Sequence, residues 1–173
     1  MNYKASLVEA FLFLCMLRVR LLLVGKHQDG FVEDGLEFFE KKLKHYCHFE
    51  TVVIGQPKLS GQLPVEEVKK REGDLLLKSF GTKSWVVLLD ERGKEPDSAA
   101  FAQLLEKWMV GGQSQVDFVV GGAFGFSKEV YERANYQLSL SKMTFSHQII
   151  RLIFAEQLYR AFTILKNEPY HHA

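Results

Sequence analysis

Hydrophobic residues in this chain alternate between short continuous runs and longer segments in which they recur at helical spacing. The short runs end at a glycine or a charged residue, as buried strands commonly do, and occupy residues 18–24, 51–54, 85–89 and 118–120. Amphipathic helices are predicted between them, over residues 31–43, 65–79 and 99–109. Because strands and helices alternate, the pattern predicts an α/β fold, with a mostly parallel sheet and helices on both faces.

Two polar loops in the second half of the chain favour a binding site. The glycine-rich segment 121–125 follows the fourth strand and precedes a helix of about ten residues that starts at Ser127. Segment 141–146 is rich in hydroxyl groups and lies between a predicted strand at 137–140 and a final helix at 147–166. Ligands of open parallel sheets bind at the carboxyl ends of the strands, so we expect the two loops to form walls of one pocket.

A charged loop is predicted at residues 90–94, directly after the strand at 85–89. Asp90 and Glu91 have the chemistry to accept hydrogen bonds from ribose hydroxyls, and a solvated loop accounts for them equally well. The glycine cluster at 121–125 matches neither G-x-G-x-x-G nor G-x-x-x-x-G-K-[ST], which favours a tight turn over a nucleotide-binding fingerprint. These features alone indicate an α/β domain with a small-molecule pocket.

The final helix is apolar around most of its circumference. Ile149, Leu152 and Ile153 lie on one side, and Ile150, Phe154, Leu158, Ala161 and Leu165 continue around another. A helix of this kind must be buried on more than one side. We therefore expect a second copy of the chain to cover it in a homodimer.

Composition narrows the class of protein. With 173 residues and 47% apolar side chains, the chain is long enough for one well-buried domain. Its 22 basic and 21 acidic residues give a net charge of +1, which provides no broad electrostatic case for nucleic-acid binding. Cys15 and Cys47 show neither CxxC nor Cys/His ligand spacing, so we expect reduced thiols in a cytoplasmic protein without a metal site.

The first residues are expected to form an extension outside the fold. The apolar run at 10–17 is far shorter than the roughly 20 residues of a membrane-spanning helix. Glu9 and the absence of a small-residue cleavage site also argue against a signal peptide. We therefore assign residues 1–15 to an extension and residues 16–173 to a single domain with Met16 as a plausible start, while an amphipathic first helix is the alternative.

Spaced motifs carry a resemblance to a known family, loosely from Leu17 and strongly from Trp85 onward. They are Leu88-Leu89-Asp90 with Gly93-Lys94, residues 118–122, Asn135-Tyr136, Leu138-Ser139, residues 141–145, His147-Gln148, Arg151, Glu156-Gln157, residues 159–161 and residues 169–171. In this order they resemble the ribosomal RNA large subunit pseudouridine N3-methyltransferases, which belong to the SPOUT class. The resemblance implies a C-terminal trefoil knot, a homodimer and S-adenosylmethionine as cofactor.

The resemblance also implies which residues form the site. The cofactor positions carry over to Leu89, Gly121, Leu140, Ser141, Lys142, Met143, Thr144 and Phe145. The implied substrate is N3 of a pseudouridine in 23S ribosomal RNA. Because the net charge is near zero, we expect it to be recognised by shape within the assembled ribosome, with no membrane partner.

The last residues of the chain, 170–172, are assigned to the RNA, and two cations to the RNA or the cofactor. His171 is expected to act as base or orienting group, and Tyr170 to stack on the target ring. Arg151 and Lys142 are candidates for contact with phosphate or the cofactor's carboxylate, and His172 for a phosphate contact. A helix of about 20 residues spans roughly 30 Å, so the tail is expected to serve the partner's pocket in the dimer.

Two departures from the family pattern keep other functions open. Phe124 stands where many members have Asn, Glu or Asp, and His172 where Lys or Arg is usual, whereas Ser146 in place of the common proline is a conservative change for a helix start. A non-catalytic RNA- or ribosome-binding module of the same fold is therefore one alternative. Another is a different nucleotide-binding enzyme on an ordinary open sheet.

Overall fold

The computed structural model describes residues 17–25, 30–55 and 63–170. The predicted extension, the turn after the first strand and most of the loop before the second helix lie outside these residues. The same holds for His171 and His172, so their assigned roles stay predictions.

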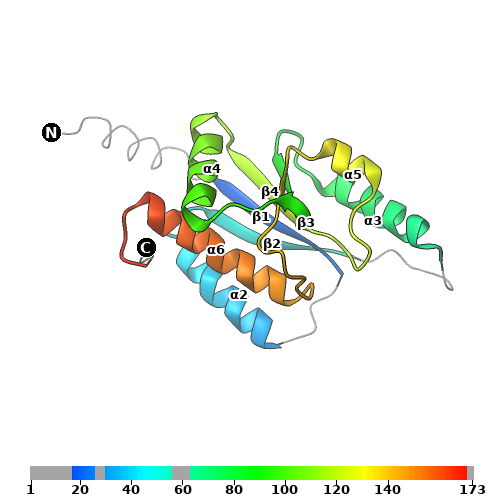
Figure 1. The fold of residues 1–173 in the computed structure, drawn as a ribbon, viewed down its shortest axis with the longest axis horizontal. Helices are drawn as coiled ribbons and strands as arrows, with labels where there is room; N and C mark the ends of the chain where they lie inside the picture. The colour runs from blue at the N-terminus through cyan, green and yellow to red at the C-terminus, as the bar shows by residue number, and fades with distance from the viewer. Residues whose placement is uncertain (1–16, 26–29, 56–62, 171–173) are drawn as a thin grey trace.

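Five strands and five helices alternate along the described chain (Figure 1). The strands are β1 (Arg18–Val24), β2 (His48–Ile54), β3 (Trp85–Lys94), β4 (Gln115–Val120) and β5 (Tyr136–Leu138). The helices are α2 (Gly30–Leu43), α3 (Val65–Ser79), α4 (Ser98–Val110), α5 (Lys128–Arg133) and α6 (Ile149–Leu165). All strands pair in parallel in the order β2-β1-β4-β3-β5, which confirms the predicted α/β fold with a parallel sheet.

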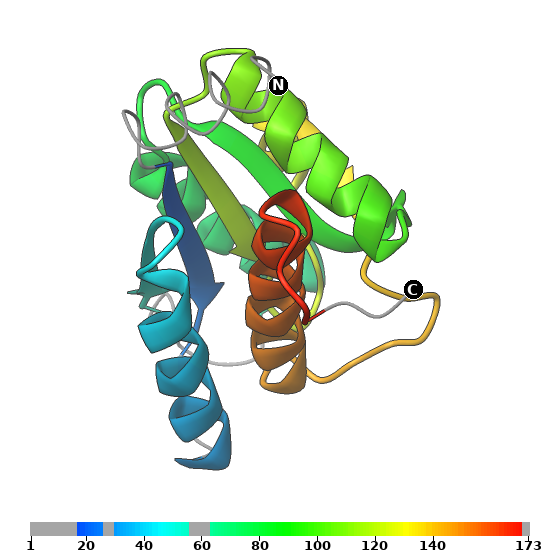
Figure 2. The same ribbon diagram turned by 90° about the vertical axis from the view of Figure 1, so that its left-hand side faces the viewer.

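The sheet separates two hydrophobic cores. Leu21, Phe118 and Phe154 belong to the larger core, where α2, α4 and α6 pack on one face. Leu22, Leu88 and Leu76 belong to the smaller core, beneath α3 and α5 on the other face. Figure 2 shows α2, α4 and α6 side by side in front of the strands. Successive side chains of a strand point to opposite faces, so neighbours such as Leu21 and Leu22 serve different cores.

Helix α6 is buried within a single chain. Phe154 and Leu158 are fully buried against the sheet. On the flank toward α2, Leu152 and Ala155 pack with Leu36, and α4 lies along the other flank (Figure 2). The sheet, α2 and α4 of the same chain therefore cover much of the apolar surface of this helix. The homodimer stays a prediction that rests on the resemblance, because the sequence pattern of α6 no longer requires a second copy.

A buried ion pair ties the first strand to the fourth. Arg20 and Asp117 stand opposite each other in the β1–β4 register. Two hydrogen bonds join their side chains, from Nη2 to Oδ2 at 2.6 Å and from Nε to Oδ1 at 2.8 Å. Burial raises the pKa of Asp117, but hydrogen bonds from Arg20 and other donors outweigh it and lower that pKa overall. Arg20 also donates to the carbonyl of Ser79 at 3.0 Å, which links the end of α3 to the sheet.

Several predicted boundaries were wrong, for reasons that lie in pairing between distant segments. Residues 90–94, predicted as a loop, continue β3 through an irregular register against β5. Helix α5 has 6 residues instead of about ten, because the side chain of Asn135 accepts a hydrogen bond from Val86 N at 2.8 Å and leads the chain into β5. Within the described ranges, no helix is long and apolar enough to cross a membrane. The trefoil knot stays a prediction.

Candidate active site

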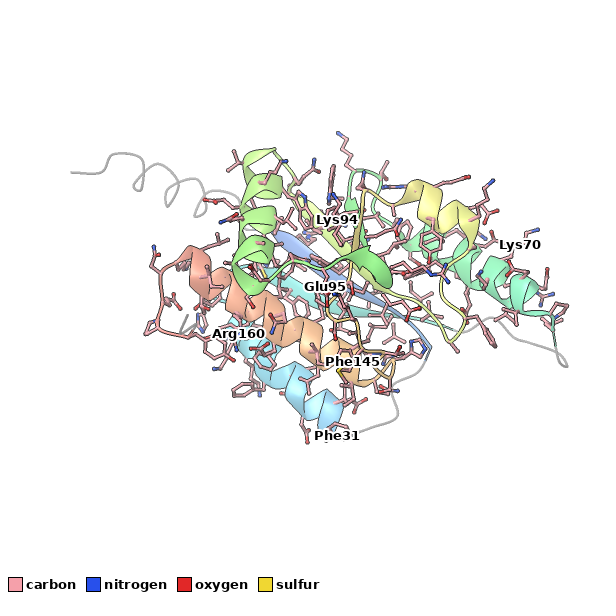
Figure 3. The ribbon with its side chains drawn as sticks, in the orientation of Figure 1. Phe31, Lys70, Lys94, Glu95, Phe145 and Arg160 are labelled. Carbon is pink, nitrogen blue, oxygen red and sulfur yellow. The ribbon has the colours of Figure 1, made fainter. Side chains whose placement is uncertain are left out.

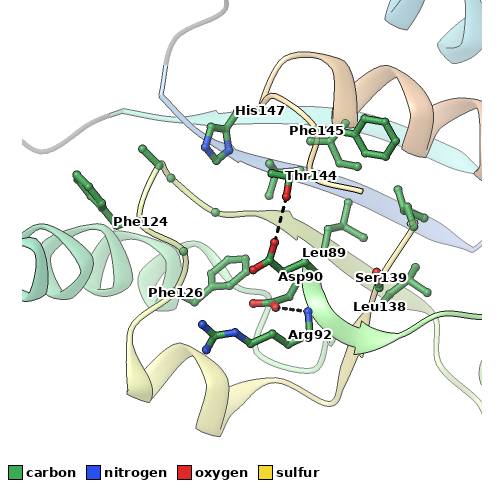
Figure 4. Close-up of a pocket in the computed structure, with 18 of the residues that line it drawn as sticks. Leu89, Asp90, Arg92, Phe124, Phe126, Leu138, Ser139, Thr144, Phe145 and His147 are labelled. Carbon is green, nitrogen blue, oxygen red and sulfur yellow. Dashed lines mark hydrogen bonds between the residues drawn. The ribbon is translucent and has the colours of Figure 1, made fainter. Parts of the chain in front are cut away.

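The carboxyl ends of β3, β4 and β5 surround one cavity of about 400 Å3. Its walls come from the end of β3, from the loop after β4 and from the segment between β5 and α6, as Figure 4 shows. Apolar walls are formed by Leu89, Val120, Leu138, Leu140 and Ile150. The two loops predicted from the sequence therefore do meet at one sheet edge, as expected for a parallel α/β fold.

An irregularity in β3 brings charged side chains into this cavity. Leu138 of β5 pairs first with Leu89 and again with Lys94, so the intervening residues of β3 bulge away from β5. Gly93 makes the close crossing possible, because a Cβ atom there would lie 2.6 Å from the carbonyl carbon of Gln137. The bulge places Asp90, Glu91 and Arg92 in the cavity wall.

The carboxylate of Asp90 is held from two directions. Its Oδ1 accepts a hydrogen bond from the backbone nitrogen of Arg92 at 2.8 Å. The hydroxyl of Tyr131, on α5, donates to Oδ2. Burial and the hydrogen bond to Asp90 raise the pKa of Tyr131 to about 12, so this phenol keeps its proton and stays a donor. Asp90 is thus a fixed acceptor, suited to a hydroxyl or a cation.

The glycine loop, residues 121–126, closes one side of the cavity. Gly125 has a φ of 79°, and its N–H donates to the carbonyl of Gly122 at 3.1 Å to form a tight turn. A Cβ atom at Gly121 would approach the ring of Phe126 to 3.1 Å. Gly121 therefore gives Phe126 room to fold under the loop. The exposed ring of Phe124 also borders the cavity. The carboxylates in the cavity wall come from Asp90 and Glu91, and position 124 supplies none.

The segment before α6 forms the opposite side. Ser139 Oγ donates to the carbonyl of Ser141 at 2.9 Å, and Ser141 Oγ accepts from Met143 N at 2.9 Å. Thr144 reaches across the cavity to Glu91, with 3.5 Å between Oγ1 and Oε2 (Figure 4). Side-chain hydroxyls thus order a segment that lacks regular secondary structure.

His147 joins this segment to the glycine loop. Burial and the positive charge of Arg151 lower the pKa of His147, while a hydrogen bond to the backbone of Gly121 acts in the opposite direction. The imidazole is therefore mostly neutral at pH 7 and lies in the cavity wall. No local sequence pattern indicates the contact of His147 with Gly121.

Seven of the eight predicted cofactor positions line the cavity, all but Lys142. The side chain of Lys142 is 90% exposed and lies 3.9 Å from Glu95. Arg151, predicted to contact RNA, is 2% exposed and donates to Gln148 at 3.2 Å. Its burial does not favour direct contact with a phosphate. Sequence reasoning missed Lys69, Phe126 and Tyr131, which line the cavity from α3, the glycine loop and α5.

The tail folds back along α6 instead of continuing away from it. Asn167 has a φ of 53° and reverses the chain, which returns the hydroxyl of Tyr170 to 3.3 Å from Glu156. The ring of Tyr170 packs edge-on against Tyr159 and lies under the guanidinium of Arg160. Tyr170 is therefore closer to the cavity than a straight helix suggests, although it is not among the lining residues.

Among the described residues, no group of three or more His, Cys, Asp or Glu side chains could hold a metal ion.

A family model described as "Predicted SPOUT methyltransferase" matches residues 17–171. The chain belongs to the SPOUT methyltransferase family. The match covers the sheet, all five described helices and every residue of the cavity wall, so this edge of the sheet is the candidate active site of a SPOUT methyltransferase.

Curated relatives of this SPOUT methyltransferase match it over most of their own length. Two proteins named "Ribosomal RNA large subunit methyltransferase H" are each 47% identical to it. The protein from Christiangramia forsetii aligns over 89% of this chain and 98% of its own, and the one from Parabacteroides distasonis over 90% and 99%. A solved structure of a probable methyltransferase from Bordetella pertussis Tohama I shares the fold, with a TM-score of 0.56 at 15% identity over 92% of this chain and 99% of that one.

Proposed function

We propose that this protein transfers a methyl group from S-adenosylmethionine to N3 of a pseudouridine in 23S ribosomal RNA, acting as a homodimer on the assembled ribosome. The observation that carries the proposal is a cavity at the carboxyl edge of the sheet in a SPOUT methyltransferase, whose relatives at 47% identity are named for ribosomal RNA methylation. The resemblance of the motifs supports N3 of pseudouridine as the position.

The described residues fit S-adenosylmethionine. The cavity volume of about 400 Å3 lies within the range of cofactor pockets. Leu89, Leu138 and Leu140 offer apolar surface for an adenine ring, and backbone groups of the glycine loop lie at the same edge. Asp90 provides a fixed carboxylate for the ribose hydroxyls or the ligand's positive charge. When bound, this cofactor supplies an electrophilic methyl group.

The protein's own contribution is alignment and control of one proton. N3 of a uracil-type ring is an imide nitrogen, which must lose its proton near the moment of attack, and a positioned base contributes about 10²–10⁴-fold. We assign this role to His171 and stacking on the target ring to Tyr170. Rigid walls that align nucleophile and methyl carbon supply the remainder without a metal.

The tail is proposed to act on the partner's cavity. Tyr170 packs on the outer side of α6 and does not line the cavity of its own chain. In Figure 3, Arg160 lies near the tail and Phe145 lies in the cavity wall. Exposed Phe31 and Phe38 on α2, on the same side of the sheet, offer apolar surface to a partner.

The decisive experiment measures methyl incorporation. Purified protein, labelled S-adenosylmethionine and ribosomes from cells lacking this protein should give one methylated pseudouridine in 23S RNA, located by mass spectrometry. A protein that binds the cofactor but incorporates no methyl group into ribosomes or free 23S RNA would be the non-catalytic module instead. Lack of cofactor binding by calorimetry would favour a different nucleotide-binding enzyme.

Complementation tests the shared site. A chain with Gly121→Val is expected to lose cofactor binding, because a side chain there would collide with Phe126 in the glycine loop. It is mixed with a chain that lacks residues 169–173, and mixed dimers are verified by differential tagging. Methylation that recovers in the mixture supports a tail acting across the interface. Mixed dimers without activity would place the tail in its own subunit's site or outside catalysis.

A further inference from the structure

Glu72 of α3 is a buried acid that no step of the proposed reaction uses. Its side chain is 6% exposed, and its enclosed Oε2 atom has no hydrogen-bond partner among the residues that the structure describes. Burial raises the pKa of this carboxyl. An enclosed acceptor without a partner destabilises a folded protein, so a role outside stability would account for its presence.

The carboxyl of Glu72 lies directly against the glycine loop. A Cβ atom at Gly122 would lie 2.2 Å from Oε2 and 2.8 Å from Oε1. The carboxyl therefore occupies the space that any side chain at Gly122 would need. The two residues are far apart in the sequence, and a side chain at position 122 would displace this carboxyl.

A second contact fixes the other end of the loop. Gly73 follows Glu72 on α3, and a Cβ atom there would lie 2.4 Å from Oγ of Ser127, the residue after the loop. Lys69, one turn earlier on α3, lines the cavity itself. Helix α3 thus supports the glycine loop from behind, at Gly122 and at Ser127.

We propose that Glu72 is a positioning residue that sets the glycine loop for the methyl donor through its contact with Gly122. A displacement of Gly122 is transmitted to the whole turn, because its carbonyl accepts the hydrogen bond from Gly125. The inference rests on the proposed function, since the ligand of this loop is the S-adenosylmethionine named there.

Cofactor affinity and thermal stability separate this role from a structural one. Glu72→Met keeps the length of the side chain and removes the carboxyl oxygens. We expect calorimetry to show an affinity for S-adenosylmethionine that is lower by at least about tenfold. The Tm should not fall, because an apolar side chain of similar volume replaces an acceptor without a partner.

Two further variants complete the design. Glu72→Gln keeps the shape and one acceptor oxygen, and should bind within about threefold of the wild type. Glu67→Met on the same helix removes an acid that pairs with Arg71 at 2.8 Å and does not line the cavity. This control should change neither the affinity for S-adenosylmethionine nor the Tm.

The outcomes are distinct. Unchanged affinity in Glu72→Met overturns the inference, whether or not Tm falls, and so does a loss of affinity in Glu72→Gln that equals the loss in Glu72→Met. If both affinity and Tm fall in Glu72→Met, retention of affinity by Glu72→Gln supports the positioning role. A wild-type protein that binds no S-adenosylmethionine would refute the proposed function and this inference together.

Discussion

Replacing Gly93 with alanine would force a carbon atom into the crossing between β3 and β5. The added Cβ would lie 2.6 Å from the carbonyl carbon of Gln137 and 2.7 Å from the nitrogen of Leu138. Carbon atoms pack comfortably at about 3.5–4.0 Å, so the two strands would have to separate by roughly 0.9 Å. Both partners are backbone atoms, and no side-chain rotation can relieve the contact.

The magnitude follows from two terms. Overpacking of this kind costs about 1–3 kcal/mol. Separation of the strands also weakens the 2.8 Å hydrogen bond from Ser139 N to the carbonyl of Lys94, worth about 1 kcal/mol. We therefore expect the free energy of unfolding of Gly93→Ala to fall by about 2–4 kcal/mol. Because the same bulge places Asp90 and Arg92 in the cavity, cofactor affinity should fall as well.

Urea unfolding followed by circular dichroism measures the effect. Protein concentration is held fixed, because the stability of a dimer depends on it. Gly30→Ala at the start of α2 is the matched control, since a Cβ there meets no described atom within 4 Å. A loss in Gly93→Ala below about 0.5 kcal/mol, the usual range for surface substitutions, would refute the account of the crossing.

Three further substitutions test other parts of the structure. Tyr131→Phe removes the donor that holds Asp90 and should weaken binding of S-adenosylmethionine about fivefold, as measured by calorimetry. Unchanged binding would contradict a contact between Asp90 and the ligand. His147 has a folded pKa below its ordinary value of 6.5, so its contribution to stability is complete above that pH and is lost as the pH falls through the folded pKa. His147→Gln should therefore lose less stability than the wild type between about pH 7.5 and about pH 5, and equal losses in urea titrations would contradict this. Asp117→Asn leaves the cation of Arg20 without its carboxylate and should lower the free energy of unfolding by about 3–5 kcal/mol; a change under about 1 kcal/mol would show that the pair is solvated.

Regular elements were predictable because each is recorded in its own side-chain spacing. The run predicted as a strand at 18–24 has the bounds of β1, and the helix predicted at 65–79 has the bounds of α3. Errors arose where a distant segment decides the local structure. Residues 90–94 read as a loop because they are charged, yet pairing with β5 extends β3 through Lys94.

The candidate site shows the same division. Adjacent glycines and a hydroxyl-rich segment after two strands identified two walls of the cavity, because the carboxyl ends of parallel strands share one sheet edge. For the third wall, at Asp90 and Glu91, the sequence left contact with ribose and a solvated loop equally open. Tyr131, which fixes Asp90, had no local sequence signal. The glycine pair was recognised, but its physical reasons, the ring of Phe126 beneath Gly121 and the carboxyl of Glu72 against Gly122, were not.

By itself, then, the sequence determined that this protein is an α/β domain with a parallel sheet, where the sheet's binding edge lies, and which family its spaced motifs resemble. Only the tertiary structure decided that α6 is covered by α2 and α4, that Arg151 is buried, and that Glu72 faces the glycine loop. The reason is physical. Side-chain periodicity records which face of an element avoids water, whereas the partner that covers that face depends on how the whole chain packs.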